Sequence, residues 1–188
     1  PLRTVSNIAL RNKFGGTIIR HAREERDFQL TPETRAAGRK ALGARRRDFV
    51  VLFIGTPRPH KGLQVVVDAL RLLNRRFVLH VVGVSSPEAF AKETACKGAR
   101  VVTHPLVQFS EVPKLLAGGD AVVLMQDVSN PISWFQIPAK IAEGLSMGLP
   151  VIMTDAPPLA DLSPRVVLRA DDAAGLAQQL RHVRKHDD

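Results

Sequence analysis

Lys140 and Glu143 lie three residues apart in a largely apolar segment of the chain. Residues at positions i and i+3 of a helix share one face, so both charged groups can point toward one ligand. A glycine and a proline follow, and then the apolar run 151–153, which predicts a helix packed against a sheet. A surface ion pair is the simpler alternative, and it would contribute less than about 1 kcal/mol. The position beside a buried strand favours a binding role.

A second group of charges follows the apolar run 49–54, where the chain reads Gly-Thr-Pro-Arg-Pro-His-Lys-Gly. This loop leads into a predicted helix, whose first backbone amides and dipole attract an anion. Two cations accompany the helix end, and a diphosphate carries enough charge to match both. The loop matches neither a Walker A sequence nor a GxGxxG dinucleotide turn. The loop therefore predicts a phosphate site, whose candidate residues are Gly55, Arg58, Lys61 and Gly62. The alternative is a solvated basic loop that binds no ligand.

Short apolar runs alternate with amphipathic stretches from residue 49 onward. This alternation is typical of βα units around a parallel sheet. The expected strands are 49–54, 77–82, 100–102, 121–125, 151–153 and 166–168. The expected helices are 63–73, 87–94, 110–117, 138–147 and 172–185, with Ser110 as the cap of the third and Pro113 in its first turn. The sequence therefore predicts an α/β fold with a Rossmann-like, doubly wound parallel sheet of about six strands, which binds ligands beyond the carboxyl ends of its strands.

The first 47 residues differ in kind from the rest. They contain a short apolar run at 17–19 and a predicted helix that ends near Leu42. Thr31 is expected to cap this helix, with Pro32 in its first turn and Gly43 after its end. We therefore expect residues 1–47 to form a connector with a lead-in helix and residues 48–188 to form the compact domain.

The net charge of +9 is concentrated in that first segment. Residues 1–47 carry 12 Lys and Arg against 4 Asp and Glu, whereas residues 48–188 carry 15 against 14. Residues 48–188 are therefore nearly neutral, and the chain has no tyrosine and no cluster of aromatic residues on which bases could stack. Both observations argue against a nucleic-acid partner. A solvated charged segment is the simplest interpretation of the basic lead-in. Peripheral contact with an anionic membrane surface is the alternative.

Cysteine and metal-ligand content narrow the class of protein further. Cys96 is the single cysteine, which leaves no internal disulfide and fits a reducing cytoplasm. No DxD or paired-cysteine spacing is present, so we expect no metal and no cofactor. The longest apolar runs are much shorter than the roughly 20 residues that cross a bilayer.

Three parts of the sequence resemble the nucleotide-sugar-binding domain of GT-B glycosyltransferases, group 1 or family 4. They are Gly55 with Lys61-Gly62, the pair Lys140 and Glu143, and the run 143–151. The resemblance extends roughly from residue 49 to the end. It implies that Lys61 holds the diphosphate of a nucleoside-diphosphate sugar, that Glu143 accepts hydrogen bonds from the ribose hydroxyls, and that Lys140 reinforces the phosphate site. It also implies metal-free, retaining transfer to a saccharide or lipid-linked saccharide.

Two positions depart from the family pattern. A second glutamate that contacts the donor sugar would stand where this chain has Phe135, and an arginine that frequently follows the loop glycine is replaced by Thr56. Arg58 is the candidate substitute for that arginine. Phe135, Gln136 and Val107 are candidate sugar or base contacts, although a packed core aromatic is the simpler role for Phe135.

Other ionisable residues are weaker candidates. His21 and His104 each stand alone in the sequence, so an ordinary hydrogen-bonded role is the simpler interpretation. Asp155 and Asp161 flank the loop after the strand at 151–153 and could approach a sugar, but acidic residues are common in turns.

The resemblance also extends to residues 5–24, which are similar to the crossing from the acceptor domain to the donor domain in such enzymes. We therefore expect the N-terminal acceptor domain to be missing from this chain, and the chain alone to bind a donor without turnover. A sugar-nucleotide epimerase half of the same GT-B architecture is one alternative, because it would use a similar ribose glutamate. A non-catalytic α/β regulatory module is the other, although a receiver-like module would need acidic clusters at the strand ends.

Overall fold

The computed structural model describes residues 2–86, 88, 90, 98–164 and 166–186. Its centre is a parallel sheet of six strands in the order β5-β4-β3-β6-β7-β8. Counted along the chain, this is the order 3-2-1-4-5-6, so the strand order reverses between β3 and β6, as in a doubly wound Rossmann-type sheet. The strands are β3 (Phe49–Ile54), β4 (Phe77–Val82), β5 (Val101–His104), β6 (Ala121–Leu124), β7 (Val151–Met153) and β8 (Leu168–Arg169).

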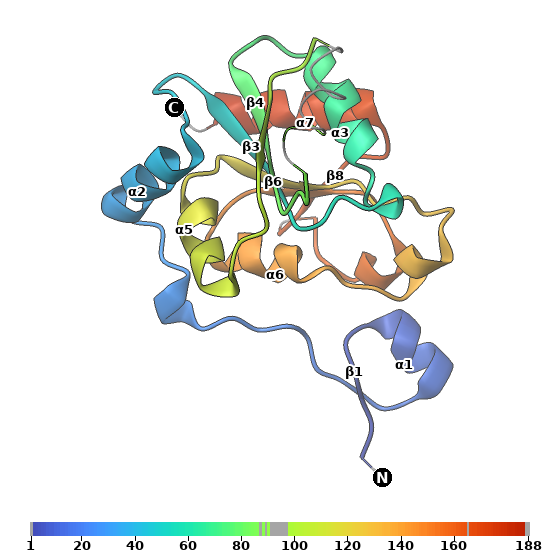
Figure 1. Ribbon diagram of the computed structural model, residues 1–188. Coiled ribbons are helices and arrows are strands. Elements are labelled where there is room, and N and C mark those ends of the chain that lie inside the picture. Colours follow the sequence, from blue (N-terminus) through green and yellow to red (C-terminus); the bar gives the residue numbers. More distant parts are fainter. Residues whose placement is uncertain (1, 87, 89, 91–97, 165, 187–188) are drawn as a thin grey trace.

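Helices cover both faces of this sheet, which explains why the central strands are apolar throughout rather than alternating (Figure 1). Side chains of β3 alternate between two cores: Val51 and Phe53 belong to one, and Leu52 and Ile54 to the other. The first core is closed by α3 (Leu63–Arg71) and α7 (Ala173–Lys185). The second is closed by α2 (Pro32–Leu42), α5 (Val112–Ala117) and α6 (Ala139–Ser146).

The first residues form a small unit beside this body. Strands β1 (Thr4–Val5) and β2 (Thr17–Ile18) pair in parallel around helix α1 (Ile8–Phe14). An extended stretch then passes through the 3₁₀ turn η1 (Glu25–Asp27) to helix α2 (Figure 1). Helix α2 packs closely on α5, since a Cβ on Gly38 would overlap the backbone nitrogen of Gly118. No helix in the part of the chain that the structure describes is long and apolar enough to cross a membrane.

Most predicted elements are confirmed, including the capped start of α2 at Thr31 and its left-handed end at Gly43. The prediction for Ser110 is wrong: it lies in the 3₁₀ turn η3 (Phe109–Glu111), and α5 begins at Val112 without a side-chain cap. Strand β8 begins two residues later than expected. The sequence did not predict α1, which is too short to show a clear apolar period. The helix expected at 87–94 falls largely outside the described residues.

Candidate functional site

The loop after β3 turns back against the end of β6. It contains the 3₁₀ turn η2 (Pro59–Lys61), and Gly62 follows with φ 64°, in the left-handed region. A Cβ at residue 62 would overlap the carbonyl oxygen of Met125, so both the conformation and the close approach require glycine here. This arrangement places the Lys61 side chain at the carboxyl edge of the sheet. The predicted position of Gly62 at the start of α3 is confirmed.

Lys61 and Lys140 converge at the carboxyl end of β3. Gly55 has φ 110°, and a Cβ on it would overlap Lys140 Nζ and lie 3.9 Å from Lys61 Nζ. The ammonium groups, which come from the loop after β3 and from the first turn of α6, therefore flank the same small space. Lys61 Nζ also donates a hydrogen bond of 2.8 Å to the Thr56 carbonyl oxygen.

The electrostatics of this pair favour an anionic ligand. Burial lowers the pKa of Lys61 to about 8, and the charges of Lys140 and Arg58 act in the same direction. Burial also lowers the pKa of Lys140, while Glu143 opposes that shift. Two partly desolvated cations repel each other in the free protein, so a polyanion that bridges them would relieve that repulsion.

Glu143 lies on α6 next to Lys140, but its carboxylate is bound by a different cation. Its side chain is 7% exposed, and Oε1 accepts a hydrogen bond of 2.6 Å from Nη2 of Arg23. Arg23 lies in the stretch between β2 and α2, and its guanidinium carbon is 5.3 Å from the ring centroid of Phe109. Among the described residues, Oε2 of Glu143 has no protein donor, so it can accept a hydrogen bond from a ligand.

Sequence reasoning missed Arg23. It lies 120 residues from Glu143, in the stretch 5–24 that resembles the interdomain crossing, and the resemblance gave it no role at the site. The one available signal was indirect: a carboxylate on the buried side of a helix needs a cationic or hydrogen-bonding partner, but the sequence does not say which of the 27 Lys and Arg supplies it.

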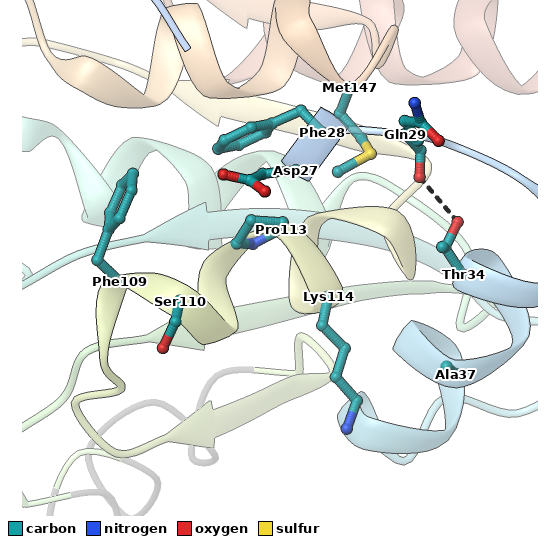
Figure 2. A pocket seen from close by; sticks show the side chains of 10 residues that line it. All are labelled: Asp27, Phe28, Gln29, Thr34, Ala37, Phe109, Ser110, Pro113, Lys114 and Met147. Atoms are coloured by element: carbon teal, nitrogen blue, oxygen red, sulfur yellow. Dashed lines mark hydrogen bonds between the residues drawn. The ribbon is translucent and has the colours of Figure 1, made fainter. Parts of the chain in front are cut away.

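A hollow of about 480 Å³ lies beside the same stretch, between residues 27–29 and α5 (Figure 2). Figure 2 shows Phe109 and Met147 among its lining side chains, together with the hydrogen bond of 2.9 Å from Thr34 Oγ1 to the Gln29 carbonyl oxygen. Phe109 connects the hollow with Arg23, whose guanidinium lies over the same ring. None of the residues predicted for the site lines this hollow, which is therefore distinct from the lysine pair.

Comparison with known families decides the classification. The family model of glycosyl transferases group 1 matches residues 48–186. The chain belongs to this family. The resemblance seen in the three sequence segments is thereby confirmed, and a comparison with curated proteins finds no match.

Solved structures resemble this chain along nearly its whole length. HepE from Anabaena, in complex with UDP-glucose, superposes with a TM-score of 0.81 at 20% identity, covering 99% of this chain and 54% of HepE. Sucrose-phosphate synthase from Thermosynechococcus elongatus superposes with a TM-score of 0.77 at 18% identity, and the match covers 97% of this chain and 48% of the synthase. WaaG, a glycosyltransferase involved in lipopolysaccharide biosynthesis, superposes with a TM-score of 0.74 at 19% identity, and the match covers 97% of this chain and 55% of WaaG. At these identities the likeness shows the fold, and the chain spans about half the length of these structures.

The remaining residues predicted for the site differ in how close they lie to the lysine pair. Arg58 is exposed at the start of η2, close enough for its charge to act on Lys61. Val107 packs partly against the second core, and Gln136 is exposed. The half-buried ring of Phe135 lies 4.6 Å from the ammonium of Lys13 on α1.

Phe135 therefore has a contact in the structure that sequence reasoning did not consider. Its carbonyl oxygen also accepts a hydrogen bond of 2.9 Å from the side-chain amide of the buried Asn7. Both contacts come from the first 14 residues. In the family pattern this position holds a glutamate that contacts the sugar, whereas in this chain Phe135 joins the N-terminal unit to the body.

The ordinary hydrogen-bonded role expected for His104 is confirmed, with a partner, His80, that the sequence did not identify. Nε2 of His104 lies 2.9 Å from Nδ1 of the buried His80, and burial lowers the pKa of both rings, that of His80 to about 4. Asp155 and Asp161 are engaged as well, in ion pairs with Arg169 and Arg20 respectively. These contacts give the two aspartates and His104 partners within the protein.

Proposed function

We propose that this chain is the donor-binding part of a glycosyltransferase that uses a nucleoside-diphosphate sugar. The observation that carries the proposal is the convergence of Lys61 and Lys140 at Gly55, next to Glu143 on the same helix face. Membership of the group 1 family and the likeness to HepE, whose structures contain UDP and UDP-glucose, support the choice of ligand.

In this proposal the two lysines bind the diphosphate. When the glycosidic bond to the nucleotide breaks, negative charge develops on the leaving diphosphate, and fixed cations that already face it lower the barrier. Lys61 and Lys140 require no large reorganisation for this role, because their elements already hold them at one point. Arg58 adds a third cation at the rim and takes the place of the arginine that Thr56 replaces.

Glu143 binds the ribose in this proposal. Arg23 engages Oε1 of Glu143, which fixes the orientation of the carboxylate. Oε2 then accepts a hydrogen bond from a ribose hydroxyl. Phe135, Gln136 and Val107 are the candidate sugar or base contacts in this proposal.

We further propose the division of labour that the resemblance implies. Residues 1–47 are the interdomain connector and lead-in helix, and residues 48–188 are the donor-binding domain. An N-terminal acceptor domain outside this chain binds a saccharide or lipid-linked saccharide, transfer retains the anomeric configuration, and the chain alone is inactive. The basic lead-in contacts the inner face of the membrane of a cytoplasmic enzyme.

Calorimetric titration with UDP, GDP and their sugars tests the proposal. We expect Lys61→Ala and Glu143→Ala each to weaken nucleoside-diphosphate binding at least tenfold, a loss of about 1.4 kcal/mol or more. Lys40→Ala, which removes an exposed lysine of α2, is the matched control and should bind like the unchanged protein. Unchanged affinity in both site variants would overturn the assignment, and no binding of any nucleotide would favour a regulatory module.

A further inference from the structure

A second basic hollow lies at the opposite edge of the sheet from the lysine pair. Its volume is about 380 Å³. Phe49 begins β3, Arg76 immediately precedes β4 and Asp120 immediately precedes β6, and all three line it. Because the strands are parallel, these starting points share the amino edge of the sheet. Nothing in the proposed donor site reaches this edge.

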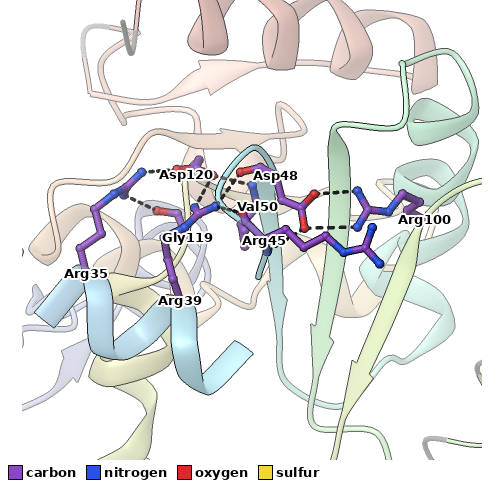
Figure 3. A network of polar contacts seen from close by, with 8 residues as sticks. All are labelled: Arg35, Arg39, Arg45, Asp48, Val50, Arg100, Gly119 and Asp120. Carbon is purple, nitrogen blue, oxygen red and sulfur yellow. Dashed lines mark hydrogen bonds and ion pairs between the residues drawn. The ribbon is translucent and has the colours of Figure 1, made fainter. Parts of the chain in front are cut away.

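The two carboxylates that line the hollow are already satisfied by the protein (Figure 3). Asp120 accepts hydrogen bonds from Arg35, from Arg39 and from the backbone N–H of Val50. Asp48 accepts bonds of 2.7 and 3.2 Å from the two terminal nitrogens of Arg100. Burial would raise the pKa of Asp48, but its hydrogen bonds with Arg100 and with the backbone of Arg45 outweigh burial and lower it. Both carboxylates therefore already have arginine partners within the protein.

The same network holds the loop that carries further cations. Nη2 of Arg39 donates bonds of 2.8 Å to the carbonyl oxygens of Arg45 and Asp48, and Asp48 accepts a bond of 3.0 Å from the Arg45 backbone N–H. Arg46 and Arg47 lie between these anchors, so the loop that presents them is fixed at both ends.

Four arginines that line the hollow have no carboxylate partner among the described residues: Arg46, Arg47, Arg76 and Arg184. The Arg184 guanidinium carbon lies 5.3 Å from the ring centroid of Phe77, which restricts its position. Arginine remains charged at every physiological pH. Among the described residues no carboxylate offsets these four charges, so an anion that enters the hollow can offset them.

We infer that this hollow is a second phosphate-binding site, for a compact phosphoryl group with more than one negative charge. Guanidinium groups bind phosphate oxygens through paired hydrogen bonds, which is the geometry that several arginines around one hollow offer. The site is independent of the proposed donor site, because it lies at the other edge of the sheet and uses arginines rather than lysines. The phosphoryl group belongs either to a free small molecule or to a lipid headgroup.

Inorganic pyrophosphate is the probe for the free ligand, measured by calorimetry at low salt. Because pyrophosphate would also bind Lys61 and Lys140, the titration is made in a Lys61→Gln/Lys140→Gln background. We expect binding to persist there and to weaken at least tenfold when Arg47→Gln/Arg76→Gln is added. Both arginines are exposed, so the melting temperature should remain the same.

A matched control removes equal charge elsewhere. Arg11→Gln/Arg26→Gln replaces two exposed arginines outside the hollow, and it should leave pyrophosphate affinity within about twofold at constant salt. An equal loss in this control and in Arg47→Gln/Arg76→Gln would show unspecific attraction by net charge and would overturn the inference.

Vesicles distinguish the source of the phosphoryl group. The protein is sedimented with phosphatidylcholine vesicles that contain phosphatidic acid, and with phosphatidylcholine alone. One outcome is that the protein binds the phosphatidic acid vesicles but not pyrophosphate, and that Arg47→Gln/Arg76→Gln abolishes the vesicle binding. This outcome would assign the site to a lipid headgroup. Pyrophosphate binding without vesicle binding would assign it to a soluble ligand. If neither probe binds, or if both bind equally to the arginine variant, the inference is wrong.

Discussion

The paired arginines at the amino edge of the sheet and the lysines at its carboxyl edge differ in how their charges are compensated. At the amino edge, Arg35, Arg39 and Arg100 are bound to the carboxylates of Asp120 and Asp48. At the carboxyl edge, Lys61 and Lys140 lie together, and the neighbouring carboxylate of Glu143 is paired with Arg23 instead. The first arrangement stabilises the fold without a ligand, whereas the second leaves charge uncompensated until a ligand arrives.

The residue types suit these two roles. Arginine is weakly hydrated and binds carboxylates with several parallel hydrogen bonds, so it suits an internal network. Lysine is a compact charge whose pKa shifts readily on burial, and burial lowers the pKa of both Lys61 and Lys140. The difference separates residues that maintain the structure from residues that are available for binding.

The strongest test of the comparison is Asp120→Ala. Removing this carboxylate leaves Arg35 and Arg39 without their anion and the Val50 N–H without its acceptor, at a site where the Asp120 side chain is 4% exposed. Breaking a buried pair in this way costs about 3–5 kcal/mol of unfolding free energy. Urea denaturation measures the loss. Asp68→Ala, which breaks an exposed pair with Arg71, is the control and should cost less than about 1 kcal/mol. A similar small loss for Asp120→Ala would contradict the structural role of the amino edge.

The histidine pair between the edges gives the next largest effect. His80 has a pKa of about 4 in the folded protein, against about 6.5 when unfolded. Between these values the unfolded chain binds more protons, so stability is complete above about pH 6.5 and falls as the pH drops toward 4. The steepest loss is about 1.4 kcal/mol per pH unit.

Urea midpoints at pH 7 and pH 5, compared between the unchanged protein and His80→Leu, isolate this contribution. Carboxylates elsewhere titrate in both proteins and cancel in the difference. The variant should lose less stability between the two pH values, and parallel curves would show that the neutral histidine pair has no energetic consequence.

The sheet could be predicted from the sequence because its signal is local. The apolar runs 49–54 and 77–82 are buried on both faces, and their composition alone identifies them as the strands that became β3 and β4. The same holds for the glycines of the loop after β3. Gly62 stands where the backbone needs a positive φ and a close approach to Met125, and that requirement leaves a readable residue type.

The side-chain partners could not be predicted, because they depend on which elements meet in space. The Arg23–Glu143 pair joins residues 120 positions apart. The His80–His104 pair depends on the register of β4 with β5, in which His80 lies opposite Val102 and His104 opposite Val82. A shift of this register would separate the rings without changing any residue that the sequence displays.

The pH dependence of binding sharpens the difference between lysine and arginine. Above about pH 8 the free protein must take up a proton on Lys61 to bind a diphosphate, so affinity should fall by up to about tenfold per pH unit. Calorimetry with UDP between pH 7 and pH 9.5 measures this slope. Lys61→Arg keeps the charge over the same range and should show a flatter profile, as should pyrophosphate at the amino edge. Identical slopes for lysine and arginine at position 61 would exclude Lys61 as the titrating group.

The smallest expected effect is that of Lys61→Met on the unfolding free energy. It tests whether the charge of Lys61 at the carboxyl edge opposes folding. The pKa of Lys61 is lower in the folded protein than its usual value, so the unfolded chain holds the proton more tightly, and the charged lysine reduces stability at pH 7. Lys61→Met should therefore leave the unfolding free energy unchanged or raise it by less than about 1 kcal/mol, while nucleotide binding is lost. Arg47→Met, an exposed substitution at the other edge, is the control for the added apolar surface. A destabilisation of Lys61→Met well beyond that of the control would show that Lys61 supports the fold, and the contrast between the two edges would then no longer hold.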